Sequence, residues 1–222
     1  MSERVTLRQF SEAEGTGDWR IVGDGACAFF ATPTLDQAAR FVAVIAALPA
    51  IETHLPDIDI RPGGVTVRLV TADEQDYGMS ARDIELAREI SGIAAAMGIP
   101  ADPRRVQSVL VIPGASDVAA IMPFWQAALG YQRRADSPEE DLVDPGGRGP
   151  AFWFETMEET RPDGGGAVHV AVWVPAEQAE ERVAAALAAG GRVVRDRFSP
   201  AWITLADAAG NELDISTISG RG

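Results

Sequence analysis

The chain contains no lysine, and it has only two histidines and one cysteine among its 222 residues. All 19 cationic residues are therefore arginines, which excludes Schiff-base chemistry and a phosphate-loop lysine. The single cysteine, Cys27, excludes a disulfide or a paired-cysteine metal site within the chain, and its small apolar neighbours predict a core residue. The search for acid/base or metal chemistry therefore starts from the two histidines, His54 and His169.

Long apolar runs and clusters of cationic residues are also missing. No stretch is long and apolar enough to span a bilayer, and no charged-then-apolar leader opens the chain, so we expect a soluble cytoplasmic protein without a membrane partner. The formal net charge of −14 disfavours nucleic acid as a partner, because binding a polyanion requires clustered cations. The apolar content of 46% is sufficient for a substantial core.

A helix stop near the middle of the chain predicts two domains. The segment Met97-Gly98-Ile99-Pro100 places glycine and then proline after a helical pattern, and the polar link Asp102-Pro-Arg-Arg105 follows. We therefore expect a boundary within residues 99–105 and domains at residues 1–101 and 102–222.

The first half combines helical and strand patterns. Thr34, with Gln37 three residues later, is typical of a helix start, and apolar residues follow at helical spacing. Residues 65–70 alternate in polarity like a strand, and Ser80-Ala-Arg-Asp83 precedes a second helical pattern. The resulting order of strand, helix, strand, strand, helix predicts an α+β domain.

The second half contains an internal repeat. Each unit runs from a strand into a helix that ends in glycine, then into an arginine-bearing strand and an Asp-x-x-Gly turn. In the first repeat we expect the strand at residues 109–112, the helix at residues 118–129 and the turn at residues 144–147. In the second repeat we expect the strand at residues 168–174, the helix at residues 177–189 and the turn at residues 207–210. The pattern predicts a duplicated βαβββ module, and hence a second α+β domain.

Several segments of this half resemble the glyoxalase-like branch of the vicinal-oxygen-chelate superfamily, over about residues 106–217. They are Pro123-Phe-Trp-Gln-Ala-Ala-Leu-Gly-Tyr131, Leu142-Val-Asp-Pro145, Gly149-Pro150 before Phe152-Trp-Phe154, and Leu205-Ala-Asp-Ala-Ala-Gly-Asn211. The resemblance implies the duplicated βαβββ fold. It does not fix one activity, because this superfamily includes isomerases, dioxygenases, resistance proteins and binders.

The same resemblance implies a candidate metal site. In this fold the ligands come from the first and last strands of each module, and those positions fall near Ser108, Glu155, His169 and Asp214. Glu155, His169 and Asp214 form a sensible set for Zn²⁺, Fe²⁺, Mn²⁺ or Ni²⁺, whereas Ser108 is a poor fourth ligand. The alternative is that the histidine and the carboxylates have ordinary roles within strands.

Tryptophans are concentrated in the second half, which holds four of the five. Because side chains alternate along a strand, Trp153 shares a face with Glu155, and Trp173 shares a face with His169. Aromatic walls around a few polar groups are typical of a site for a flat apolar ligand, so Trp153 and Trp173 are candidate substrate-binding residues. The alternative is that these rings fill the core.

The first half resembles pterin-4a-carbinolamine dehydratase over about residues 18–97. The matching segments are residues 35–48, His54-Leu-Pro-Asp-Ile-Asp-Ile60, residues 65–70 and Asp83-Ile-Glu-Leu-Ala87. The resemblance implies an antiparallel sheet with helices on one face. It also implies dehydration of a 4a-hydroxypterin, which requires protonating a leaving hydroxyl and removing a ring N–H proton.

The histidines of this family are only partly present. The family pattern is His-His-Pro, then Thr-His-Asp, then an aspartate that opens the last helix. His54, Pro56 and Asp83 match it, whereas Leu55 and Ala72 replace the second and third histidines. The resemblance implies that His54 transfers the proton, that Asp83 orients His54 or the pterin, and that Pro56 shapes the loop.

Three functional hypotheses follow. The leading one is a weakened pterin-4a-carbinolamine dehydratase-like hydro-lyase fused to a glyoxalase-like domain that binds a small molecule. The second is a metal-dependent lyase, isomerase or dioxygenase centred on His169, Glu155 and Asp214. The third is a non-enzymatic ligand-binding or assembly protein. Both resemblances imply a homo-oligomer.

Overall fold

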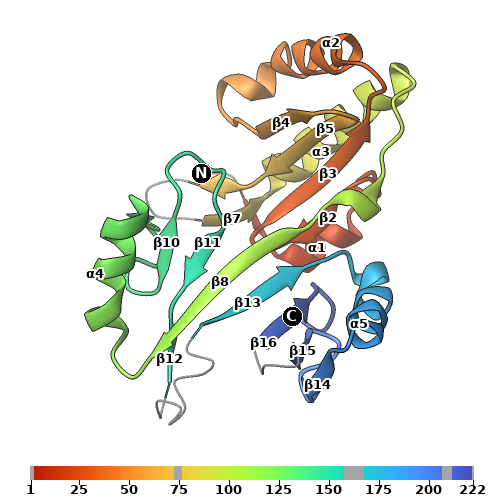
Figure 1. Ribbon diagram of the computed structural model, residues 1–222. Coiled ribbons are helices and arrows are strands. Elements are labelled where there is room, and N and C mark those ends of the chain that lie inside the picture. Colours follow the sequence, from red (N-terminus) through yellow and green to blue (C-terminus); the bar gives the residue numbers. More distant parts are fainter. Residues whose placement is uncertain (1–2, 73–76, 158–167, 207–211, 222) are drawn as a thin grey trace. The chain divides into compact units, whose positions relative to one another are not determined.

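The structure, a computed structural model, describes residues 3–72, 77–157, 168–206 and 212–221. The chain divides into two compact units (Figure 1). Unit 1 comprises residues 1–106 and 221–222, and unit 2 comprises residues 107–220. None of the helices in the described ranges is long and apolar enough to cross a membrane.

Unit 1 is an α+β domain. Its elements are β1 (Arg4–Val5), α1 (Leu7–Glu12), β2 (Arg20–Val22), β3 (Gly25–Ala31), α2 (Leu35–Ala46), the 3₁₀ helix η1 (Pro49–Glu52), β4 (Asp57–Arg61), β5 (Gly64–Leu69), β6 (Thr71–Ala72), β7 (Tyr77–Ser80), α3 (Ala81–Ala96) and η2 (Pro103–Arg105). Strands β2, β3, β5 and β4 form an antiparallel sheet in that order, and β1, β7 and β6 form a smaller one. The predicted strand at residues 65–70 is therefore present as β5.

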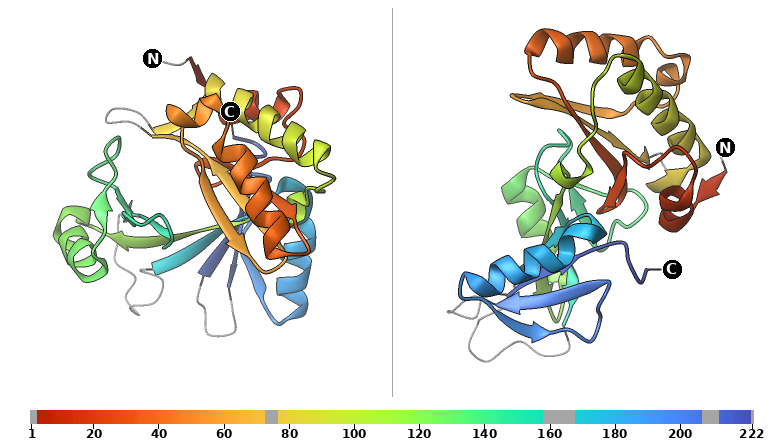
Figure 2. Two further views of the ribbon diagram at one scale, coloured as in Figure 1. Left: turned by 90° about the horizontal axis from the view of Figure 1, so that it is seen from above. Right: turned by 90° about the vertical axis from the view of Figure 1, so that its right-hand side faces the viewer.

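Helices α2 and α3 cover one face of the larger sheet (Figure 2). Phe30 of β3 lies 5.1 Å from Phe41 of α2 and 6.2 Å from Trp19, centroid to centroid. The indole N–H of Trp19 donates to the carbonyl oxygen of Ala87 in α3 at 3.2 Å. Both helices therefore pack on the side of β3 that carries Phe30, as the predicted antiparallel sheet with helices on one face requires.

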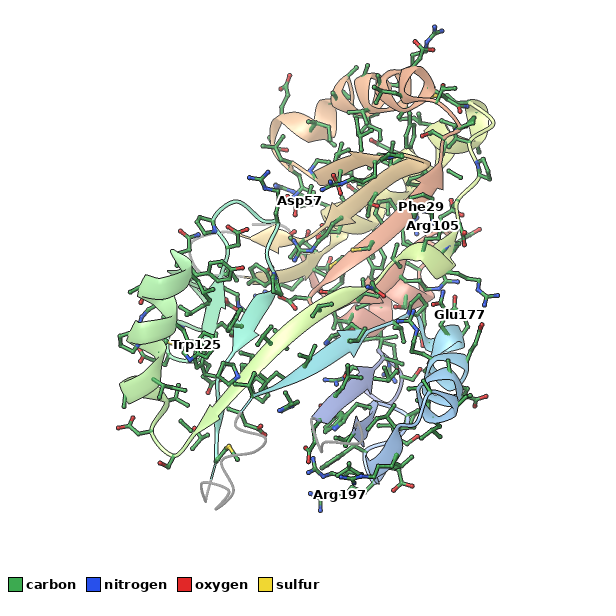
Figure 3. The ribbon with its side chains drawn as sticks, in the orientation of Figure 1. Phe29, Asp57, Arg105, Trp125, Glu177 and Arg197 are labelled. Carbon is green, nitrogen blue, oxygen red and sulfur yellow. The ribbon has the colours of Figure 1, made fainter. Side chains whose placement is uncertain are left out.

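The link after α3 packs against unit 1. The amide of Asp102 donates to the carbonyl oxygen of Phe29 at 2.8 Å, and Ala101 forms a bridge with Phe30. The guanidinium of Arg105 lies 3.9 Å from the centre of the Phe29 ring (Figure 3). These contacts explain why the units divide between Val106 and Gln107, rather than between residues 101 and 102 as the sequence pattern predicted.

Unit 2 consists of two βαβββ modules. The first contains β8 (Ser108–Ala115), α4 (Val118–Leu129), β9 (Gln132–Arg133), β10 (Asp141–Val143), β11 (Ala151–Trp153) and β12 (Glu155–Thr156). The second contains β13 (Val168–Trp173), the 3₁₀ helix η3 (Ala176–Gln178), α5 (Ala179–Ala188), β14 (Arg192–Arg195), β15 (Trp202–Ala206) and β16 (Glu212–Ser216). The predicted duplication is confirmed.

The strand order shows the symmetry of the duplication. The sheet runs β14-β15-β16-β13-β8-β11-β10-β9, and β12 also pairs with β8. The first strands of the two modules, β8 and β13, are antiparallel neighbours, and each is flanked by a parallel strand from the end of its own module. The two modules are therefore related by an approximate two-fold rotation between β8 and β13.

The apolar core of unit 2 lies between the sheet and its two helices. Met122 of α4 packs with Leu142 and Phe152 of the strands, and Leu205 and Ile215 pack against α5. Trp125 of α4 joins the first cluster, 5.4 Å from Phe152 (Figure 3). One face of the sheet is therefore apolar and covered by helices.

Some predicted boundaries were wrong. The strand on which Trp153 and Glu155 were expected to share a face is interrupted at Phe154, whose amide donates to the carbonyl oxygen of Glu140 at 2.7 Å. The helix expected at residues 177–189 is divided into η3 and α5. The short helix α1 was not predicted. The predicted Asp207–Gly210 turn lies outside the described residues.

Candidate active site

His54 lies in the loop between η1 and β4, beside a buried carboxylate. The amide of His54 donates to the carbonyl oxygen of Ala50 at 3.0 Å, which fixes the backbone of the loop. The Nε2 atom of His54 lies 2.7 Å from Oδ1 of Asp83. The side chain of Asp83 is fully buried, whereas that of His54 is 10% exposed. The predicted pair of His54 and Asp83 is therefore brought together, although the two residues are far apart in the sequence.

Asp83 is held by several donors. Its Oδ2 atom accepts hydrogen bonds from Thr71 Oγ1 at 2.7 Å, from the Ser80 amide at 2.7 Å and from Ser80 Oγ at 2.9 Å. Burial raises the pKa of Asp83, but the hydrogen bonds from His54, Thr71 and Ser80 outweigh burial, so the pKa is lowered overall. Asp83 is therefore an ionised carboxylate at neutral pH.

The start of α3 explains this geometry. Ser80 is the N-cap and Asp83 is the third residue of the helix, and together they form a capping box. The N-terminus of a helix also favours a negative charge. Asp83 therefore both caps α3 and contacts His54.

Thr71 and Ser80 were not among the predicted site residues. Thr71 reaches Asp83 from β6, which pairs with β7 so that Thr71 lies opposite Gly78. The Thr71 and Ser80 hydroxyls are also 2.8 Å apart. The sequence did contain a signal for both, since Thr71 opens the Thr-Ala-Asp segment and Ser80 was predicted to start a helix.

The other predicted positions in unit 1 differ in their exposure. Pro56 is half-buried, two residues after His54. Leu55, at the position of the second family histidine, is 77% exposed. Ala72, at the position of the third, belongs to β6. Neither leucine nor alanine can transfer a proton, so His54 is the imidazole that this loop supplies for acid/base chemistry.

His169 in unit 2 also has a carboxylate partner. Its Nε2 atom lies 3.5 Å from Oδ2 of Asp214, and Thr204 Oγ1 donates to Oδ1 of Asp214 at 2.6 Å. The interaction with Asp214 raises the pKa of His169, while burial lowers it to a smaller extent. Two of the three predicted metal ligands are therefore neighbours.

The third predicted ligand, Glu155, does not complete a metal site. Within residues 3–72, 77–157, 168–206 and 212–221, no group of three or more His, Cys, Asp or Glu side chains could hold a metal ion. Glu155 lies opposite Gly114 on one side of β8, whereas His169 lies opposite Ile112 on the other side. Two strand spacings, about 9–10 Å, and a further ~7 Å along the strand separate their backbones. The structure therefore does not assemble the predicted three-ligand set.

Ser108 is also far from His169. It lies opposite Trp173 on β13, at the other end of that strand from His169. At ~3.3 Å per residue, the distance along the strand is about 13 Å. Ser108 therefore cannot serve as a fourth ligand beside His169.

The two predicted aromatic positions lie on strands of unit 2. Trp153, at the end of β11, is half-buried and its indole N–H donates to Oε2 of Glu140 at 3.4 Å. Trp173, at the end of β13, is also half-buried. Neither residue belongs to the buried apolar clusters against α4 and α5.

Comparisons with known proteins match each unit separately. The family model described as pterin 4 alpha carbinolamine dehydratase matches residues 3–93, and the glyoxalase-like domain model matches residues 109–216. A Roseiflexus sp. (strain RS-1) protein named "Putative pterin-4-alpha-carbinolamine dehydratase" is 35% identical over 95 residues, covering 42% of this chain and 99% of the relative. The solution NMR structure of an Agrobacterium tumefaciens protein has 24% identity and a TM-score of 0.24, and covers 50% of this chain and 96% of its own.

Proposed function

The chain belongs, through its first half, to the pterin-4a-carbinolamine dehydratase family and carries a glyoxalase-like domain in its second half, and from this premise we propose that unit 1 dehydrates a pterin 4a-carbinolamine. The observation that carries the proposal is the contact between His54 and the buried carboxylate of Asp83. A histidine oriented by a carboxylate is well suited to general acid/base catalysis. Only one family histidine is present, so we expect a weakened hydro-lyase.

A single histidine can complete the reaction. A carbinolamine carries a hydroxyl and an N–H on adjacent atoms of one C–N bond. Protonated His54 gives its proton to the hydroxyl, the C–O bond breaks and water leaves, and the nitrogen lone pair forms a C=N bond. Neutral His54 then removes the N–H proton of the iminium, which restores the protonated histidine. Atoms and charge balance over the cycle.

In this proposal each ring nitrogen of His54 has its own role. Nε2 faces Asp83, so Nδ1 is the atom that exchanges the proton with the substrate. The carboxylate of Asp83 faces His54 and orients its ring for the proton transfer. Asp83 is a positioning residue in this scheme, and Thr71 and Ser80 hold it in place.

The test is the dehydration rate of a 4a-hydroxytetrahydropterin with the purified 222-residue chain. We expect acceleration above the uncatalysed rate, and we expect His54→Ala to reduce the catalysed rate by a factor of about 10²–10⁴, the usual contribution of a positioned acid or base. Leu55→Ala is the matched control, because Leu55 is adjacent and exposed but transfers no proton. This control should retain the rate of the unmodified chain.

Two outcomes would contradict the proposal. The first is an unmodified 222-residue chain that leaves the rate at background, which would favour a pterin-binding or assembly role for unit 1. The second is a catalysed rate that His54→Ala does not change, which would place the acid/base group elsewhere. Circular dichroism of each variant separates a loss of chemistry from a loss of folding.

A further inference from the structure

Arg68 contacts two segments of unit 1 that both lead to the candidate active site. Its Nη1 atom donates to Oδ2 of Asp57 at 3.0 Å, and its Nη2 atom donates to the hydroxyl oxygen of Tyr77 at 2.8 Å. Asp57 is the first residue of β4 (Figure 3), and Tyr77 is the first residue of β7. One guanidinium on β5 therefore joins the start of β4 to the start of β7.

Asp57 directly follows the loop that carries His54. The hydrogen bond from the His54 amide to the carbonyl oxygen of Ala50 fixes one end of this loop, and Asp57 lies opposite Arg68 in the pairing of β4 with β5. Pro56 lies between His54 and Asp57, and a proline restricts both its own backbone and that of the residue before it. A shift of Asp57 is therefore transmitted to His54 through a short, stiff segment.

Tyr77 begins the segment that supplies donors to Asp83. Strand β7 runs from Tyr77 to Ser80, whose amide and hydroxyl both donate to Oδ2 of Asp83. β7 also pairs with β6, and this pairing places Gly78 opposite Thr71, which is another donor to Asp83. The position of β7 therefore determines where the Asp83 carboxylate is held.

The chemistry of arginine suits this junction. A guanidinium is planar and presents its N–H donors in a rigid fork, so acceptors on two of its nitrogens are held at a fixed separation. The Arg68 side chain is 32% exposed, and partial burial strengthens its hydrogen bonds. Arg61 on β4 is a contrasting case, because its side chain is 69% exposed and its Nε atom donates to Asp59 of the same strand. Of these two arginines, Arg68 is the one that joins separate segments.

We propose that Arg68 is a positioning residue of the candidate active site, which fixes the distance between His54 and Asp83 by holding β4 and β7 together. Its effect on the dehydration rate rests on the proposed function of unit 1, whereas its effect on the contact of His54 with Asp83 does not. Neither Arg68 nor Tyr77 belongs to the family pattern of histidines, proline and aspartate. The role is inferred from the contacts of Arg68 with Asp57 and Tyr77.

The first test follows the contact between His54 and Asp83 directly by NMR. The 222-residue chain has only two histidines, so its ¹⁵N-histidine spectrum contains two imidazole rings, and His54→Ala assigns them. The Nε2–H proton of His54 faces Asp83. We expect its exchange with water to be faster by a factor of about 3–10 in Arg68→Gln and in Tyr77→Phe, the range expected for loss of a hydrogen bond. The imidazole of His169 is the internal reference and should not change.

The second test separates kcat from KM in the dehydration of a 4a-hydroxytetrahydropterin. We expect Arg68→Gln to lower kcat by a factor of about 10–100, because a small misplacement of the acid/base group is costly. KM should not change, because a positioning residue does not contact the substrate. Arg68→Lys should not restore kcat, since lysine keeps the charge but lacks the fork. Arg61→Gln is the matched control, which removes an arginine and its ion pair from the same sheet and should leave both constants unchanged.

Several results would overturn the proposal. They are proton exchange at His54 that Arg68→Gln does not change, full rescue by Arg68→Lys, an equal effect of Arg61→Gln, and a raised KM with unchanged kcat. The last result would make Arg68 a substrate-binding residue. Circular dichroism verifies the fold of each variant, and Tyr77→Phe, which removes only a hydroxyl, tests the junction if Arg68→Gln does not fold. If the unmodified chain shows no dehydratase activity, the proposed function fails, and the exchange measurement still decides the role of Arg68.

Discussion

Asp83 takes part in two different interactions. It caps α3 through the Ser80 amide, and it contacts the histidine proposed as the proton-transfer group. A fully buried carboxylate is stable only when donors surround it, and Thr71 and Ser80 supply them. The same hydrogen bonds therefore stabilise the start of the helix and the charge beside His54.

Asp83 predicts a pH dependence of stability. Its pKa is lowered in the folded chain, because the hydrogen bonds from His54, Thr71 and Ser80 outweigh the effect of burial. The ionised Asp83 side chain therefore contributes its full stabilisation of the fold above the pKa of aspartate in the unfolded chain, about 3.9. This stabilisation is lost as the pH falls below that value toward the pKa of Asp83 in the folded chain. We expect the difference in unfolding free energy between the chain and Asp83→Asn to shrink as the pH falls from about 5 toward 3. Urea denaturation at each pH measures it, and a difference independent of pH would contradict this assignment.

The site could be predicted from the sequence only in part, and the two histidines show why. The pair of His54 and Asp83 was predicted from the family pattern, which has a histidine before the proline of this loop and an aspartate that opens the last helix. The contact of Thr71 with Asp83 was not predicted: the Thr-Ala-Asp segment marks the position, but the contact itself depends on the pairing of β6 with β7. Glu155 and His169 were expected to meet, but strand register places them on opposite sides of β8.

At the scale of elements, capping residues decided which predictions were accurate. Helix α4 has the predicted bounds because Asp117 caps its start and Gly130, with φ 68°, ends it. The segment expected as one helix at residues 177–189 ends before Gly190, with φ 98°, but it has no such side-chain cap at its start. Gln178 at its start is buried and caps without a side-chain hydrogen bond, and the chain forms η3 before α5. Local sequence predicts a helix boundary where the cap is local, and fails where burial sets the boundary.

Two glycines in unit 1 should respond oppositely to alanine. Gly64 begins β5 opposite Ala31, and a Cβ there would lie 2.6 Å from the carbonyl oxygen of Phe30 and also overlap the ring of Phe29. Gly92 is exposed within α3, and a Cβ there meets nothing within 4 Å among the described atoms. We expect Gly64→Ala to reduce the unfolding free energy by about 1–3 kcal/mol and Gly92→Ala to increase it by about 0.5–1 kcal/mol. Chemical denaturation measures both, and equal effects would contradict the packing around Gly64.

At the scale of the molecule, each unit has its own core. In unit 1 the buried aromatic residues Phe30, Phe41 and Trp19 join the sheet to its helices, and in unit 2 the clusters around Phe152 and Leu205 do so. Each core is built from residues of one unit, and the two family models match the two units separately. Each unit therefore has what a domain needs to fold by itself.

This separation predicts two thermal transitions. Phe41→Ala removes a fully buried ring from unit 1, and Leu205→Ala removes a buried side chain from unit 2. Each change costs about 2–5 kcal/mol, and for a domain of this size every kcal/mol lowers the transition temperature by about 4–8 °C. In differential scanning calorimetry of the full chain, we expect Phe41→Ala to lower one transition by about 10 °C or more while the other stays in place, and Leu205→Ala to do the reverse. A single transition that both variants lower would show that the units unfold together, because a change in either core would then destabilise the whole chain.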